Sequence, residues 1–255
     1  MTILSNSRDA AAPWEISHGA HPEHTLRRQT TTGAAAAAPG AADLQFQRDG
    51  CKEPGAGDRY ACRPCDFDLH VECALAETVM AHPLFKDAQF RLQELLRPGG
   101  GHDDDNAGSG SGSGSILCVA CGGEVLGLHY HCAANARKKK GYLGLDIHPW
   151  CAALPREIRR EELTLELRKE AFHRCDSCPS RRDIGGWFYR STCKTVYLHV
   201  ACVKGIMIAD GGGGGSSGST DPLAAVKEAA LRIYRAKKDE EGEVERVILA
   251  LVLGG

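Results

Sequence analysis

Cysteine and histidine residues recur in this chain at spacings that can hold a metal ion. The stretch "YACRPCDFDLHVEC" (60–73) contains Cys62, Cys65, His70 and Cys73 in the pattern C-x2-C-x4-H-x2-C. Thiolate sulfur and imidazole nitrogen are ligands that zinc prefers, and four of them complete a closed tetrahedral site. The rest of the chain decides whether these four residues bind one ion or belong to two sites.

The H-x2-C part of this pattern occurs three times, which indicates repeated modules. It is found in "DLHVECALA", "DIHPWCAALP" and "YLHVACVKG". Each copy is preceded by an aromatic residue and a cysteine, and further upstream by another cysteine cluster. Each copy also opens with an alternating, strand-like segment, at 24–29, 82–93 and 163–169. One unit written three times is typical of tandem small modules rather than of one large domain.

Comparison of the copies separates the ligands into two sets. The C-x2-C after the aromatic residue is reduced to Cys132 in the second copy and to Cys193 in the third, while H-x2-C and an upstream C-x2-C are kept. Ligands of one site should persist or be lost together, because three ligands hold zinc less well than four. The repeats therefore predict an interleaved layout with two complete sites: Cys118, Cys121, His148 and Cys151 form one, and Cys175, Cys178, His199 and Cys202 form the other.

The pattern resembles the plant cysteine/histidine-rich proteins built from divergent C1 domains, which are relatives of the zinc-binding C1 domain of protein kinase C. The resemblance covers about residues 16–207 and is carried by "HPEHTL", "AHPLF", "DRYACRPCDFDLHVECALA", "HPWCAALP" and "YRSTCKTVYLHVAC". It implies two zinc ions per complete module in a cross-braced layout. It also implies that a leading histidine, His24 or His21, joins Cys62 and Cys65, with His82 at about the place of the family's final ligand.

The first module departs from this family pattern. Arg48 stands where the early C-x2-C needs a cysteine, so Cys51, His70 and Cys73 lack a fourth ligand. The sequence thus predicts two to three structural zinc ions per chain. Each would supply about 10–16 kcal/mol to a module whose own core is marginal.

The expected fold is three tandem α+β modules, each with short antiparallel strands and a short helix stapled by zinc, followed by a C-terminal helical tail. The expected boundaries are a disordered tail at 1–15, modules at 16–82, 82–157 and 158–209, a Gly/Ser linker at 210–220 and the helical tail at 221–255. An Ala/Gly-rich insertion (31–42) lies in the first module and a Gly/Ser-rich insertion (98–115) in the second. The tail has apolar residues at helical spacing after Asp221, a candidate N-cap. It either packs on its own module or docks a partner or a membrane surface.

Composition narrows the class of protein. The 255 residues include 31 Lys and Arg against 33 Asp and Glu, a net charge of -2, which disfavours a nucleic-acid binder. The N-terminus lacks the apolar core of a secretory signal, and no stretch approaches the length of a transmembrane span. We therefore expect an intracellular, cytoplasmic or nuclear protein in which cysteine pairs bind metal rather than form disulfides.

The function expected from these features is that of a zinc-binding adaptor without enzymatic activity, which binds a protein partner. The family resemblance implies a role in plant signalling or stress response. One alternative is binding of diacylglycerol or another lipid, but the segment between Cys51 and Cys62, "KEPGAGDRYA", is short and polar. Another is protein-disulfide reduction by the C-x2-C thiols, which normally requires a cysteine pair at a helix N-terminus.

Overall fold

The computed structural model describes most of the three modules and the tail. The described residues are 12–29, 46–47, 49–55, 58–86, 88–94, 115–133, 144–169, 174–178, 186–212 and 221–253. Arg48, residues 1–11 and most of the predicted low-complexity segments lie outside them.

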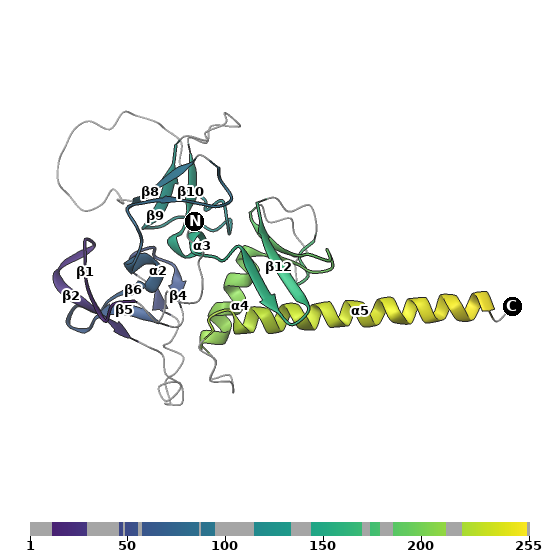
Figure 1. The fold of residues 1–255 in the computed structure, drawn as a ribbon. Coiled ribbons are helices and arrows are strands. Elements are labelled where there is room, and N and C mark those ends of the chain that lie inside the picture. Colours follow the sequence, from purple (N-terminus) through teal and green to yellow (C-terminus); the bar gives the residue numbers. More distant parts are fainter. Residues whose placement is uncertain are drawn as a thin grey trace.

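The chain forms three small antiparallel sheets of four strands each, in the order of the sequence repeats (Figure 1). The first contains β1 (Glu15–His18), β2 (His21–Gln29), β5 (Arg59–Cys62) and β6 (Phe67–His70). The second contains β7 (Val79–Ala81), β8 (Gln89–Gln93), β9 (His129–Cys132) and β10 (Leu145–Ile147). The third contains β11 (Glu157–Arg160), β12 (Leu163–Arg168), β13 (Phe188–Ser191) and β14 (Tyr197–His199). A two-stranded ladder of β3 (Phe46–Gln47) and β4 (Pro54–Gly55) belongs to the first module.

In every module the last strand runs directly into a helix. The helices are α2 (Val71–Ala74), α3 (Pro149–Ala152) and α4 (Val200–Gly212), and the residue before each is the histidine of H-x2-C. The histidine therefore ends a strand or directly follows it while the cysteine lies in the first helical turn, which places both side chains on one side of the junction. In the first module a short 3-10 helix, η2 (Arg63–Cys65), begins directly after Cys62 and ends at Cys65.

A buried tyrosine occupies the same position in each of the three sheets. The hydroxyl groups of Tyr60, Tyr130 and Tyr189 donate to carbonyl oxygens just ahead of the first strand of their own module, at 2.5, 3.0 and 2.6 Å. The acceptors are Pro13, Glu77 and Pro155. Because a buried phenol needs such a partner, this bond fixes where the chain enters each module. Residues 12–15 accordingly lie against the first module.

The modules contact one another through a repeated backbone interaction. The N–H of Leu128 donates to the Gly50 carbonyl at 2.9 Å, and the N–H of Trp187 donates to the Ala120 carbonyl at 2.8 Å. Leu128 and Trp187 directly precede β9 and β13, and Gly50 and Ala120 directly precede a cysteine. The first and second modules thus each present the upstream cysteine loop to the residue that precedes an inner strand of the following module.

Both contacts require a glycine directly before the residue whose N–H donates the hydrogen bond. A Cβ atom on Gly127 would lie 2.1 Å from the Gly50 carbonyl oxygen, and one on Gly186 would lie 2.7 Å from that of Ala120. Gly186 also has a φ of +150°, which residues with side chains rarely adopt. Glycine is therefore needed at these two positions because two backbone segments approach each other closely there.

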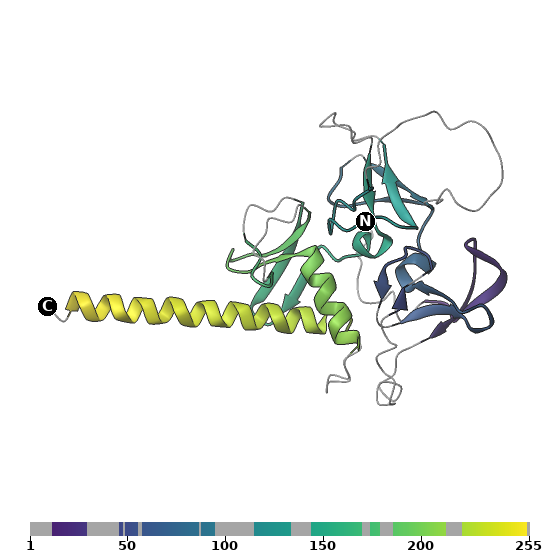
Figure 2. The same ribbon diagram turned by 180° about the vertical axis from the view of Figure 1, so that it is seen from behind.

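The C-terminal helix α5 (Ala224–Leu253) confirms the predicted helical tail. The Asp221 carboxylate accepts the N–H of Leu223 at 3.0 Å, so it caps the first turn. Leu223, Val226 and Ala230 are buried, and the beginning of the helix contacts α4 and β11. Further along, the helix projects away from the modules (Figures 1 and 2). Val244 in this part is 58% exposed. None of the described helices combines the length and apolar character of a membrane span.

Candidate metal centres

The structure gathers cysteine and histidine side chains into four groups, and within each group the ligand atoms all lie within 4.8 Å of one another. We call them outer site 1 (His21, His24, Cys62, Cys65), inner site 1 (Cys51, His70, Cys73), inner site 2 (Cys118, Cys121, His148, Cys151) and inner site 3 (Cys175, His199, Cys202). All twelve cysteines of the chain are free thiols. The motif at 60–73 is therefore divided between two groups, in the interleaved layout that the repeats predict.

Inner site 2 has four donors, and all of them are buried. The Nδ1 atom of His148 lies 3.5 Å from the Cys121 sulfur and 4.0 Å from the Cys151 sulfur. The other ring nitrogen, Nε2, lies 3.2 Å from the Glu124 carbonyl oxygen. Donation from Nε2 leaves the Nδ1 lone pair facing the sulfurs, the arrangement that a metal-binding histidine needs. In a tetrahedral zinc site neighbouring ligand atoms are about 3.6–3.8 Å apart, so spacing and donor types both fit zinc.

In each inner site one thiol has a lowered pKa, while the pKa of a second thiol, Cys73, Cys151 or Cys202, is raised by its cysteine neighbours. The pKa of Cys118 is lowered to about 3, that of Cys51 to about 4 and that of Cys175 to about 5. In each case the largest cause is a hydrogen bond from another thiol of the same group. A cysteine has to be deprotonated to bind zinc, so these groups already favour the binding form of one ligand.

Inner site 3 contains an imidazole whose polar atoms have no partner. Both ring nitrogens of His199 are buried without a hydrogen bond within the described residues. Leaving a buried polar atom unpaired costs about 1–3 kcal/mol, so a metal ion bound there would remove a real penalty. Cys178 lies beside Cys202 and interacts with it, although it falls outside the compact group of three. The predicted fourth ligand is thus next to the site.

Outer site 1 includes both histidines that the sequence left as alternatives. The Nδ1 atom of His24 lies 3.2 Å from the Cys65 sulfur and 3.3 Å from Nε2 of His21. The ring of His21 stacks on Phe67 with 4.6 Å between centroids. Two cysteines and two histidines complete a tetrahedral donor set, and Cys65 and His24 are exposed to solvent.

The structure places His82 away from Cys62 and Cys65. The pairing of β8 with β9 and that of β2 with β5 can be aligned on the two buried tyrosines, Tyr130 and Tyr60. In this alignment Ala88 of the second module corresponds to His24 of the first, and His82, six residues earlier, corresponds to His18. Both His82 and His18 accept the N–H of the residue two positions later on Nδ1, at 3.2 and 3.1 Å. His82 is buried against Trp187, and burial, followed by two nearby cations, lowers its pKa to about 4. It holds a turn and packs, whereas the family resemblance placed it at about the position of a final ligand.

The second and third modules have replaced the outer site with other interactions. The registers place Ala88 and Leu163 where the first module has His24, and Cys132 and Ser191 where it has Cys62. Ala88 and Leu163 are buried. An apolar side chain therefore stands in place of the histidine ligand.

Ser191 is the residue that closes the corresponding turn in the third module. Its buried Oγ accepts the N–H groups of Thr195 and Val196, both at 2.9 Å. The sequence comparison assigned the surviving cysteine of this pair to Cys193, but Cys193 is exposed within the turn, two residues further on. A hydroxyl with two hydrogen bonds thus organises a turn that Cys62 and Cys65 organise in the first module.

Inner site 1 offers three donors within the described residues. The His70 Nδ1 atom lies 3.3 Å from the Cys51 sulfur and 3.8 Å from the Cys73 sulfur, and all three residues are buried. This incomplete set agrees with the missing cysteine at 48, a position outside the described residues. A donor set of two cysteines and one histidine leaves room for a water or another ligand in the fourth position.

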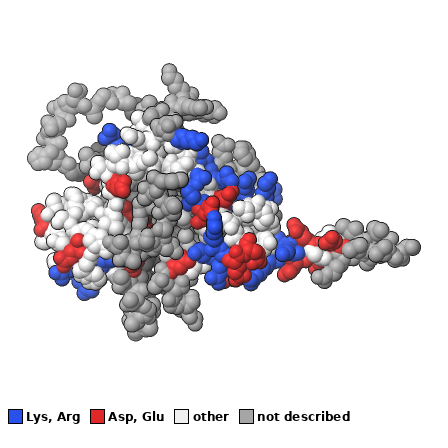
Figure 3. Space-filling view, in the orientation of Figure 1, with Lys and Arg blue, Asp and Glu red and all other residues white. Residues whose placement is uncertain are grey.

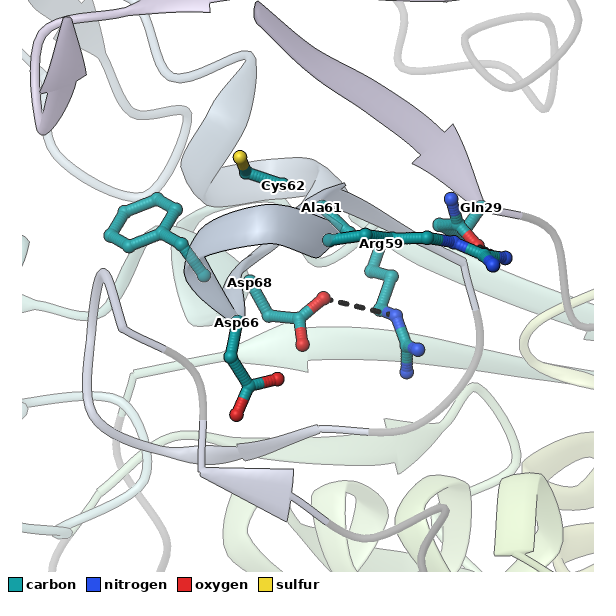
Figure 4. Close-up of a pocket in the computed structure, with 8 residues that line it drawn as sticks. Gln29, Arg59, Ala61, Cys62, Asp66 and Asp68 are labelled. Atoms are coloured by element: carbon teal, nitrogen blue, oxygen red, sulfur yellow. Dashed lines mark hydrogen bonds and ion pairs between the residues drawn. The ribbon is translucent and has the colours of Figure 1, made fainter. Parts of the chain in front are cut away.

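Two regions of the described surface have a polar or mixed-charge character. A cavity on the first module is lined mainly by polar residues, among which Arg59 pairs with Asp68 at 3.0 Å (Figure 4). Arg63 donates to Gln29 in the same cavity, at 3.2 Å. On the face drawn in Figure 3, basic and acidic side chains alternate over the third module and the nearby part of α5. Neither an apolar slot nor a surface of one sign is present there.

No protein-family model, curated protein or solved structure matched this chain in the comparisons.

Sequence reasoning missed the residues that join the modules. Gly127 and Gly186 belong to a Gly-x-x-Tyr pattern that occurs in all three modules, at 57–60, 127–130 and 186–189. That repeat was the available signal. Glu53, whose carboxylate lies 3.5 Å from Nδ1 of His148, had no such signal, because its partners are distant in sequence.

Proposed function

We propose that this protein is a zinc-stapled, non-enzymatic interaction protein of the divergent C1 type. The observation that carries the proposal is inner site 2, where three cysteines and one histidine from two separate segments meet, fully buried and without a disulfide. A closed four-ligand set of this kind suits structural zinc rather than catalytic zinc, which keeps an open position.

The location of the cysteines supports a structural role. At inner site 2 the helix α3 begins with Pro149 directly after His148, while the pair Cys118 and Cys121 lies in a turn. A redox pair is normally found at a helix N-terminus, where the helix dipole activates the thiol. Strands of three to nine residues around each group form sheets too small to be stable without a further cross-link.

Metal analysis of the purified protein tests this proposal. We expect at least two to three zinc ions per chain and up to four if inner site 1 fills, with loss of folded structure on chelation. Cys121→Ser should remove one zinc equivalent, whereas Cys193→Ser, at an exposed cysteine outside all four groups, should remove none. Metal-free protein with an unchanged fold and rapidly reacting thiols would overturn the proposal.

The interaction role rests on the resemblance and on the polar, mixed-charge surface. We propose an intracellular adaptor that binds a protein partner through loops between the metal ligands, in plant signalling or stress response. An insulin-reduction assay measures the disulfide-reductase alternative, and sedimentation with diacylglycerol-containing vesicles measures the lipid alternative. Activity in the first or zinc-dependent sedimentation in the second would replace the adaptor proposal.

A further inference from the structure

A buried ion pair from the first and third modules lies beside the metal centre of the second. Lys204 of α4 donates to Oε1 of Glu53, and the two side chains are only 15% and 9% exposed. The other carboxylate oxygen of Glu53, Oε2, lies 3.5 Å from Nδ1 of His148. Residues 151 positions apart thus meet at inner site 2.

The carboxylate is directed at the metal-facing side of the histidine. Nδ1 is the ring nitrogen nearest the sulfurs of Cys121 and Cys151, while Nε2 faces the Glu124 carbonyl. Nδ1 therefore has a lone pair and no proton to offer Glu53. Within the described residues Oε2 is buried and has no hydrogen-bond partner. A buried carboxylate oxygen without a donor is costly, and a divalent ion held by the four donors would supply the positive charge that this oxygen lacks.

Lys204 carries a positive charge that offsets negative charge at inner site 2. Three thiolates and a neutral imidazole around a divalent ion leave a net charge of minus one, and Glu53 adds another negative charge. The Lys204 ammonium group contacts Oε1 of Glu53, whose other oxygen lies 3.5 Å from Nδ1 of His148. The ammonium group therefore balances both the carboxylate and the thiolates.

The two residues also connect the neighbouring inner sites. Glu53 is two residues after Cys51, and its backbone N–H donates to the Cys51 sulfur in inner site 1. Lys204 is two residues after Cys202 of inner site 3. Each side chain therefore leaves one metal group and reaches across to another.

We propose that inner site 2 is completed from the neighbouring modules, with Glu53 as an outer carboxylate and Lys204 as its counter-charge, so that loading of this centre fixes the three modules to one another. The inference rests on the proposed zinc binding and deepens it. Glu53 and Lys204 act here as positioning residues. By linkage, metal occupancy and module docking then stabilise each other.

The test uses the full-length, zinc-loaded protein and the variants E53Q and K204Q, with E157Q as the matched control, since Glu157 is an exposed carboxylate paired with Arg159. Transfer of zinc to a chromophoric chelator measures affinity, and amide hydrogen exchange of Leu128 measures docking of the first module on the second. Coupling between two linked sites typically changes an affinity by about 5–150-fold. We expect E53Q to bind as many zinc ions as the wild type but to release one of them about 5–150-fold more readily, with faster exchange at Leu128.

The result that overturns the proposal is an E53Q protein with wild-type chelator transfer and wild-type exchange at Leu128. If E53Q does not fold, the same two measurements on K204Q decide, because Lys204 approaches the surface at one end of the contact. Failure of zinc binding itself is recognised separately, since the wild type and E157Q would then also be metal-free.

Discussion

Replacing Gly127 with alanine should separate the first module from the second while leaving their metal groups intact. The added Cβ would lie 2.1 Å from the Gly50 oxygen, 3.1 Å from the carbonyl carbon of Cys51 and 3.2 Å from its Cα. All three atoms are backbone, so no side chain can rotate away. Relief of the first contact requires a displacement of about 1 Å, which breaks the Leu128 N–H bond to the Gly50 carbonyl.

The magnitude follows from what this displacement removes. The hydrogen bond contributes about 0.5–1.5 kcal/mol. Leu128 is 6% exposed and packs with Leu26, Tyr60 and Leu69 in the core of the first module, and burial of a leucine contributes about 1.5–3 kcal/mol. Docking should therefore weaken by about 2–4.5 kcal/mol, a factor of about 30–2,000 in the docking equilibrium.

Amide hydrogen exchange and zinc content of the same samples provide the assay. We expect Leu128 in Gly127→Ala to exchange faster by a similar factor, with an unchanged number of bound zinc ions. Gly205→Ala is the control, because a Cβ at Gly205 in α4 meets nothing within 4 Å. Wild-type protection of Leu128 in Gly127→Ala would refute the close-approach argument.

Three further perturbations test other parts of the fold. Ser191→Ala leaves the N–H groups of Thr195 and Val196 without their acceptor and should cost about 1–3 kcal/mol in urea unfolding, whereas an unchanged midpoint would contradict the role of the hydroxyl. His82 has a pKa of about 4 when folded and 6.5 as its ordinary value, so the unfolded state binds more protons between these values and stability falls as pH drops from about 6.5 to 4. Between pH 6.5 and 4 the stability of His82→Asn should therefore fall less than that of the wild type, by up to about 3 kcal/mol. Parallel pH profiles of the two proteins would argue against a buried neutral histidine. Val226→Asp, at a fully buried position of α5, should lower the free energy of unfolding by more than about 3 kcal/mol. Val244→Asp, at an exposed position, should change the melting temperature little. Equal effects of the two substitutions would show that α5 does not pack as described.

The pairing of ligands could be predicted because it depends on short covalent spacing. H-x2-C at a strand-to-helix junction and C-x2-C in a turn each place two donors together whatever the surrounding fold. Losses in the second and third copies then showed which pairs belong together. The same reasoning found the helical tail, since its cap and apolar spacing are local. The three antiparallel sheets follow from the alternating segments, although their strand bounds do not.

Features that depend on strand register or on contacts between modules were not accessible. Separating His82 from His21 and His24 required the ladder that aligns Ala88 with His24, because the family resemblance offered all three as ligands. The sequence placed Ser191 near the lost cysteine of the third module, but aligning it with Cys62 required the pairing of β13. The contact of Glu53 with Lys204 joins residues of different modules, which no periodicity in either segment encodes.

The distribution of outer sites is explained by the cores available to each module. In the first module the buried cluster consists of Leu26, Tyr60, Leu69 and three cysteines, with Leu128 borrowed from the second. The second and third modules share one larger core, which extends to Val226 and Leu231 of α5. Apolar burial there can replace what a metal supplies, so Ala88 and Leu163 can take the histidine position without loss of the fold. The first module has no comparable apolar core, and it therefore keeps the four donors of outer site 1.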